Sequence, residues 1–323
     1  MNKKLDKKTI AVVLFIIVVL LIPMIVSNSY TLRILCNVMI YSIIALSINL
    51  IVGYCGQLDF GRAAFVGLGA YCSAILTTTV GIPFIVSFIL AGLFSAAFGA
   101  FLGLLCRYSS FDYLTLITVG FAEICRKLFQ NWYAVTNGSF GFRTTRPNFF
   151  GYTLTSPRSM YYFCLIILVL CYIAVRRITK SKIGRAYMAI RDDSIAAAYA
   201  GIDVKKFKLH NFVVASFFTG IAGALMGHFT TFISPTLYTI DESLLELQMT
   251  ILGGLGSLPG SILGAAVLTI VPELSRSVYE YRLLIMGAIM VVLMIFAPKG
   301  LLGRDGVFDK IVSAINKKHT QKN

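Results

Sequence analysis

The sequence predicts an all-α fold, a polytopic transmembrane bundle of about 8–10 membrane segments that includes broken or re-entrant helices. Of the 323 residues, 57% are hydrophobic and only 13% are charged, whereas a soluble domain carries about 25% charged residues. The apolar residues also form long blocks, and roughly 17–25 residues are needed to cross a bilayer. These blocks are 10–26, 84–106, 160–175 and 283–298.

The net charge of +15 is distributed in a way that predicts topology. Of the 29 Lys and Arg residues, four lie in the tail 1–9, nine lie in 176–208 and six follow from residue 299 onward. Cytoplasmic segments of membrane proteins are enriched in these residues. Because no basic stripe is interleaved with aromatic residues, the charge does not indicate a nucleic-acid partner. The bilayer is the partner that it indicates.

The first elements follow from the apolar blocks. We expect a cytoplasmic tail at 1–9 and a retained helix at 10–26. A cleaved secretory signal is the alternative for this block, although no small-x-small cleavage site follows clearly. A span at 34–53 comes next, then a Gly-rich segment and helix at 58–80, and a span at 83–106.

The middle of the chain alternates between crossings and loops. Residues 111–132 are expected to cross outward, and 133–158, rich in Gly, Pro, Asn and aromatic residues, to form an external loop. The span 159–176 leads inward to the longest polar stretch, 177–208, and 209–232 crosses outward again.

The C-terminal part contains two short apolar segments, 244–256 and 260–275, which form either two short crossings or one re-entrant hairpin. The last span, 283–298, completes a transmembrane domain at 10–303, and 304–323 is a basic tail. This parity places both termini in the cytoplasm, in agreement with the charge distribution.

Two Gly-rich breaks interrupt the membrane segments, one in each half of the chain. Broken helices persist at membrane depth only where they are buried in protein or line a cavity, and paired breaks indicate a transport path. Close helix packing is the alternative, which the G-x-x-x-G spacings at 99/103, 223/227 and 260/264 also favour. The candidate path residues in the breaks are Gly56, Gln57, Asp59, Gly61, Gly253, Gly254 and Gly256.

Glu123 is a further candidate for the path, because a charge inside a membrane helix is costly. Arg126 and Lys127 follow three and four residues later, so both are expected to face Glu123 on one side of a helix. The alternative is a locally neutralised charge cluster near the outer interface.

The sequence does not indicate an enzyme. It has no phosphate-binding loop, no H-E-x-x-H and no G-x-S-x-G motif. The seven cysteines are at least seven residues apart, and the three histidines have no metal-ligand spacing. We therefore expect no catalytic residue, no metal and no cofactor, and interpret His210 and His228 as hydrogen-bonded structural histidines.

The polar stretch contains a distinctive segment at 181–201, a short, charged, Ala-rich helix that ends at a glycine. Arg185 and Arg191 are expected to oppose Asp192 and Asp193. Small residues on such a helix favour docking into a groove on a soluble partner. A solvated loop helix without a partner is the alternative.

Several motifs, in order over most of 50–303, resemble the M-type permease subunits of branched-chain amino-acid ABC importers. Arg62, which is often His in that family, and Asn137, which is usually Gly, depart from the pattern. Besides 181–201, the matching motifs are GQLDFG (56–61), FVGLGAY (65–71), TVGFAEI (118–124), TNGSFG (136–141), ISP (233–235), GGLGS (253–257) and PKGLLG (298–303).

The resemblance implies a multi-pass permease in a bacterial inner or plasma membrane. Its partners would be a homologous second permease, two cytoplasmic ATP-binding subunits, and an extracellular or periplasmic protein that delivers leucine, isoleucine or valine. Alternating access would be driven through 177–208 as the coupling loop. The implied coupling residues are Gly184, Arg185, Ala189, Arg191, Asp192, Asp193, Ala197 and Gly201.

Other functions stay open at this point. A permease of the same type could carry urea, short amides or another amino acid. A channel or ion-coupled carrier that works alone is an alternative from a different class, although few acidic residues lie within the apolar spans. A membrane enzyme is disfavoured by the absent motifs.

Overall fold

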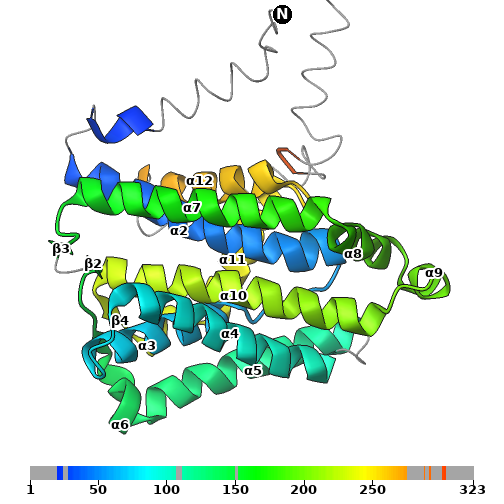
Figure 1. Ribbon diagram of the computed structural model, residues 1–323, viewed down its shortest axis with the longest axis horizontal. Coiled ribbons are helices and arrows are strands. Elements are labelled where there is room, and N and C mark those ends of the chain that lie inside the picture. The colour runs from blue at the N-terminus through cyan, green and yellow to red at the C-terminus, as the bar shows by residue number, and fades with distance from the viewer. Residues whose placement is uncertain are drawn as a thin grey trace, which may run out of the picture.

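A computed structural model describes residues 20–24, 28–106, 111–149, 152–274, 287, 291 and 300–302. The tails predicted at 1–9 and 304–323 lie outside the described residues, as does almost all of the spans predicted at 10–26 and 283–298. The long helices run side by side in a layered bundle (Figure 1). Helices α8 and α9 lie at one end of this bundle, and the short strands lie at the other.

The first half of the described chain consists of helices joined by short connections. Helix α2 begins after Asn28, whose side chain accepts a hydrogen bond from the Tyr30 N–H at 3.0 Å, as expected of an N-cap. The elements are α2 (Ser29–Ile48), the π-helical segment η1 (Asn49–Tyr54), α3 (Arg62–Thr78), α4 (Phe84–Cys106) and α5 (Phe111–Asn131).

The loop predicted at 133–158 contains several small elements: α6 (Tyr133–Thr136), η2 (Gly138–Phe140), β1 (Phe142–Arg143), β2 (Asn148–Phe149) and β3 (Tyr152–Thr153). Strand β2 pairs with β3, and β1 pairs antiparallel with β4 (Phe232–Ile233), which follows α10. The loop is thereby attached to the end of α10.

The second half begins with the long helix α7. Helices α8 and α9 occupy the polar stretch of the sequence, and α10 follows them. The elements are α7 (Pro157–Lys180), α8 (Lys182–Asp192), α9 (Ser194–Tyr199), α10 (Val204–Thr230), η3 (Pro235–Leu237), α11 (Ile240–Gly253) and α12 (Leu258–Leu274).

The predicted fold class, an all-α polytopic bundle with broken helices, is confirmed. Among the described residues, four helical stretches are long and apolar enough to cross a membrane: Ser29–Tyr54, Phe84–Leu105, Pro157–Lys180 and Val204–Thr230. Helix α12 supplies a shorter apolar helix, Leu258–Glu273.

Helix α10 lies at the centre, packed against α4 and α3. Small residues permit this close approach. A methyl group on Gly223 of α10 would collide with the backbone carbonyl of Val66 on α3, and one on Gly99 of α4 would collide with Ser216. The close packing predicted from small-residue spacing is therefore present at these helix contacts.

Candidate functional site

The first break follows directly from α2. The helix loosens into η1, and the chain then leaves the helical conformation at Gly56, whose φ of 71° favours glycine. Residues 57–61 are irregular, and α3 starts at Arg62. Gln57, Asp59 and Gly61 are all buried. A short irregular segment thus lies inside the bundle, as the Gly-rich sequence predicted.

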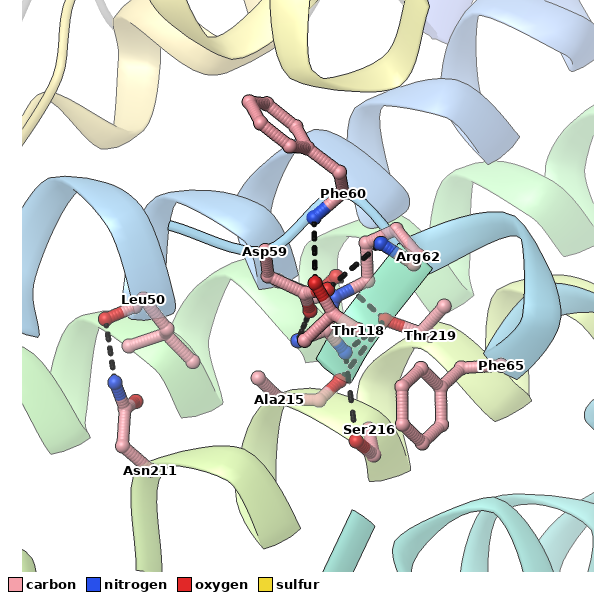
Figure 2. A network of polar contacts seen from close by, with 12 residues as sticks. Leu50, Asp59, Phe60, Arg62, Phe65, Thr118, Asn211, Ala215, Ser216 and Thr219 are labelled. Atoms are coloured by element: carbon pink, nitrogen blue, oxygen red, sulfur yellow. Dashed lines mark hydrogen bonds and ion pairs between the residues drawn. The ribbon is translucent and has the colours of Figure 1, made fainter. Parts of the chain in front are cut away.

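Side chains from neighbouring helices satisfy the backbone groups of this break. Asn211 Nδ2 on α10 donates to the Leu50 carbonyl at 3.0 Å, and Thr118 Oγ1 on α5 accepts from the Phe60 N–H at 3.3 Å (Figure 2). Such compensation is what irregular backbone requires at membrane depth.

The second break separates α11 from α12. Gly254 and Gly256 have φ values of 112° and 80°, which favour glycine. Gly253 packs directly against Gly260 at the start of α12, so the two short helices come close together. The segment predicted as two crossings or a hairpin is therefore a pair of packed helices with a tight glycine turn.

The two breaks lie against each other, joined by Asn49 of η1, which is fully buried. Its Nδ2 donates to the Ser257 carbonyl at 2.9 Å and to Ser261 Oγ at 2.6 Å, and its Oδ1 accepts from the Gly256 N–H at 2.8 Å. One amide side chain therefore links segments about 200 residues apart in sequence, and buried amides of this kind are costly to leave unpaired.

Arg191, at the end of α8, contacts the first break and lies beside the second. Its Nη1 donates to the Gly53 carbonyl at 2.7 Å. A methyl group on Gly56 would lie 2.8 Å from Arg191 Cγ, and one on Gly256 would lie 3.4 Å from Nη1. The predicted coupling segment and the predicted path glycines thus meet at one side chain.

A buried ion pair lies directly after the first break. Arg62 Nη2 lies 2.9 Å from Asp59 Oδ2, with both side chains shielded from solvent. Asp59 Oδ1 accepts from the Gly61 N–H at 2.9 Å, and Arg62 Nη1 makes longer contacts of 3.4 and 3.3 Å to Ser216 and Thr219 on α10 (Figure 2). In an apolar interior these two charges require each other.

The coupling segment forms two short helices. Asp193, expected to oppose an arginine, instead caps α9 by accepting from the N–H groups of Ile195 and Ala196 at 2.8 and 3.0 Å. These hydrogen bonds hold the pKa of the Asp193 carboxyl below its ordinary value. Arg191 pairs with Asp192 at 3.1 Å. Tyr187 of α8 bonds His210 Nδ1 of α10 at 2.6 Å.

The remaining coupling residues lie on the same two helices and their ends. Gly184 is buried against the backbone of Thr179, and Ala197 is buried on the inner face of α9. Arg185 is exposed and Ala189 half-buried. Gly201 adopts a φ of 84° just beyond α9, a conformation common where helices end.

Glu123 forms an ion pair with Arg126 on its own helix, α5. Lys127, also expected to face Glu123, interacts with it electrostatically, and its Nζ lies 3.5 Å from Gln130 Oε1. Among the described residues, the hydrogen bonds and ion pairs of Glu123 do not reach either break. The structure therefore brings Arg191 to the glycine breaks but leaves Glu123 apart from them.

Three buried residues were missed as site residues by the sequence analysis: Asn49, Arg62 and Glu246. Arg62 drew notice only as a departure from a family pattern. Glu246 is the single charge within the apolar stretch 244–256, a signal that identifies it. His228, interpreted as structural, is buried with Nε2 2.9 Å from Ser73 Oγ. Among the described residues no group of His, Cys, Asp and Glu is arranged to hold a metal ion.

Comparison with known proteins matches this chain to permeases of branched-chain amino acid transport systems. Residues 30–294 match the family described as "Branched-chain amino acid transport system / permease component". The chain is 35% identical to the "High-affinity branched-chain amino acid transport system permease protein LivM" of Escherichia coli, over 92% of this chain and 76% of that protein. It is 24% identical to the corresponding LivH protein of Escherichia coli, over 83% of this chain and 92% of that protein. No solved structure matches the chain.

The family match covers most of the chain, from within α2 to beyond α12. It includes both breaks, the buried ion pair, and α8 and α9. The chain therefore belongs to the family of branched-chain amino acid transport system permease components.

Proposed function

We propose that this chain is a membrane-spanning subunit of an ATP-driven importer and forms part of the path for leucine, isoleucine and valine. The names of its relatives, which refer to high-affinity branched-chain amino acid transport, support this substrate class. The path runs beside the two breaks, where irregular backbone lies inside the bundle.

The energy comes from separate ATP-binding subunits that dock on α8 and α9. Helix α9 has the surface that a docking element needs. Ile195 and Tyr199 are 69% and 90% exposed, whereas Ala197, on the opposite face of the helix, is buried against the rest of the protein. Exposed apolar groups among polar ones mark interaction sites. These helices lie at one end of the bundle (Figure 1), which we assign to the cytoplasmic side together with both termini.

The observation that carries the proposal is the hydrogen bond of Arg191 to Gly53 in the first break, at a position beside the second break. A displacement of α8 by the ATP-binding subunits acts directly on Gly53, and through Asn49 on the second break. Two packed segments joined by a few hydrogen bonds are suited to a change between two discrete arrangements. Such a change supplies the alternation between outward-facing and inward-facing states.

The complete assembly contains a second, homologous permease, two ATP-binding subunits and a substrate-binding protein. That protein docks at the opposite end of the bundle, where loop 133–158 lies. The membrane is the bacterial inner or plasma membrane.

The test is uptake of radiolabelled leucine into vesicles that contain this chain with its partners. The proposal predicts concentrative uptake that requires ATP, the ATP-binding subunits and the binding protein. Concentrative uptake by this chain without the ATP-binding subunits would identify a stand-alone carrier and contradict the proposal. ATP-driven uptake of a different solute, but not of leucine, would overturn the substrate assignment alone.

A further inference from the structure

Glu246 is a buried carboxylate that faces the interior of the bundle. Its side chain is 1% exposed, and its Oε2 has no hydrogen-bond partner among the described residues. On the same face of α11, Ser243 Oγ accepts from the Ala63 N–H at 2.9 Å and Thr250 Oγ1 donates to the Ala45 carbonyl at 3.2 Å. Residues at this spacing share one side of a helix, so Glu246 points toward α2 and the start of α3.

The buried charges near Glu246 do not balance. The carboxylate and guanidinium side chains buried in the described part of the chain are Asp59, Arg62 and Glu246. Asp59 and Arg62 are paired at 2.9 Å. Glu246 interacts electrostatically with Arg62, but also with two other acids, Asp59 and Glu242. Even when the less buried Glu242 is left out, the buried side chains hold one acidic group more than the single guanidinium can neutralise.

A bound cation would stabilise the charged form of Glu246, because a buried carboxylate is stable in that form only when it is paired. A primary ammonium group carries one positive charge and three hydrogen-bond donors, which suits a carboxylate oxygen without a partner. Arg62 Nε also has no hydrogen-bond partner among the described residues. Arg62 Nε can therefore donate to a carboxylate of a ligand whose ammonium group is accepted by Glu246.

The position of Glu246 connects this cluster to the path. Helix α11 runs directly into the second break at Gly253, and its inner face packs against the helix that follows the first break. Gln57, in the first break, is also buried and leaves its Oε1 without a partner in the described structure. Unmet hydrogen-bonding groups are thus present in the first break and on the helix that leads into the second.

We propose that Glu246 binds the α-ammonium group of the transported amino acid, with Arg62 receiving its carboxylate. This inference rests on the proposed function and names a substrate-contacting site within it. The chemical class that fits is a zwitterionic amino acid, and the same site discriminates against carboxylic acids that lack the amino group.

The test measures equilibrium binding of radiolabelled leucine to the purified complex of both permeases and the ATP-binding subunits, without the binding protein. Glu246→Gln is expected to weaken leucine binding about tenfold or more. Asp241→Asn, which removes an exposed charge from the same helix, is the matched control and should leave binding unchanged. Unaltered leucine affinity in Glu246→Gln would overturn the inference.

A second measurement separates recognition from a structural role. The wild-type complex is expected to prefer leucine about tenfold or more over 4-methylpentanoate, which is leucine without its ammonium group, and Glu246→Gln should lose this preference. If the complex with Glu246→Gln does not assemble, the affinities of the wild-type complex for leucine and for 4-methylpentanoate decide. Equal affinity for both ligands, or no binding at millimolar leucine, contradicts the site. ATP-driven leucine uptake by the complete wild-type complex would still support the proposed function.

Discussion

Arg191 Nη1 donates a hydrogen bond to the carbonyl oxygen of Gly53 at 2.7 Å, joining a helix at the end of the bundle to a break inside it. Gly53 lies one helical turn from Asn49, which holds the second break. A continuous set of contacts therefore runs from α8 through the first break to the second. Because only a few contacts separate the short helix α8 from the two irregular segments, we expect movement of α8 to be transmitted to both breaks.

Loss of this contact is expected to uncouple the transporter. A hydrogen bond from a charged donor contributes about 1.5–3 kcal/mol, so Arg191→Ala should lower leucine uptake about tenfold or more while the complex still hydrolyses ATP. The measurement is leucine transported per ATP hydrolysed by the reconstituted complex. Asp192→Asn is the control, because its exposed ion pair with Arg191 contributes at most about 1 kcal/mol. Equal coupling in Arg191→Ala and the wild type would exclude the role of this contact.

The buried pair of Asp59 and Arg62 should dominate the stability of the first break. Asp59→Asn breaks the 2.9 Å ion pair with Arg62. Removing one partner of a buried pair costs about 3–5 kcal/mol, so the midpoint of thermal unfolding in detergent is expected to fall. The double variant Asp59→Asn with Arg62→Gln removes both charges and should regain part of the loss. A midpoint of the double variant at or below that of Asp59→Asn would contradict this account.

The approach of α10 to α3 makes a sharp packing prediction. In Gly223→Ala the new methyl group meets the backbone of Val66, which cannot rotate away, so we expect destabilisation by about 1–3 kcal/mol. Gly120→Ala is the matched control on α5, because an added methyl group there meets no atom within 4 Å. It should be neutral or slightly stabilising, since alanine favours helices. Equal thermal stability of the two variants would count against the packing.

The cap of α9 should respond to pH. The pKa of Asp193 is lowered in the folded state by the N–H groups of Ile195 and Ala196. Its contribution is therefore complete above the ordinary pKa of about 3.9 and is lost as the pH falls through the lower, folded value. In the wild type, the protection of the Ile195 and Ala196 amides against exchange, relative to their intrinsic exchange rates at each pH, should fall in that window. In Asp193→Asn, whose side chain caps a helix without titrating, the protection should show no such change with pH. An identical change in both proteins would reject the role of Asp193 as a cap.

Much of the fold could be predicted because each crossing carries its own hydropathy signal. The span predicted at 34–53 corresponds to α2 and η1, and the one predicted at 209–232 corresponds to α10. The glycine breaks were visible because closely spaced glycines are poor helix formers. Loop 133–158 gave no strand signal, because each of its strands has only two residues. One of them, β1, also depends on pairing with β4, which is distant in the sequence.

The site was only partly predictable. Gly56, Gly256 and Arg191 were identified separately, but their meeting depends on tertiary packing between segments about 140 and 200 residues apart in the sequence. Asn49 had no local signal, since one amide at the end of an apolar block is common. Glu246 had such a signal, as a lone acid in an apolar stretch, whereas Glu123 attracted attention although its charge is neutralised by Arg126.

The most direct test of the central claim determines on which side of the membrane α9 lies and whether the ATP-binding subunits cover it. In a variant without native cysteines, Tyr199→Cys and Phe140→Cys place thiols at exposed positions, in α9 and shortly after α6. Helices α9 and α6 lie at opposite ends of the bundle (Figure 1). A membrane-impermeant maleimide should label Tyr199→Cys only in inside-out vesicles, and bound ATP-binding subunits should protect it. Phe140→Cys should react only from the cell exterior. Labelling of Tyr199→Cys from outside intact cells would contradict the account.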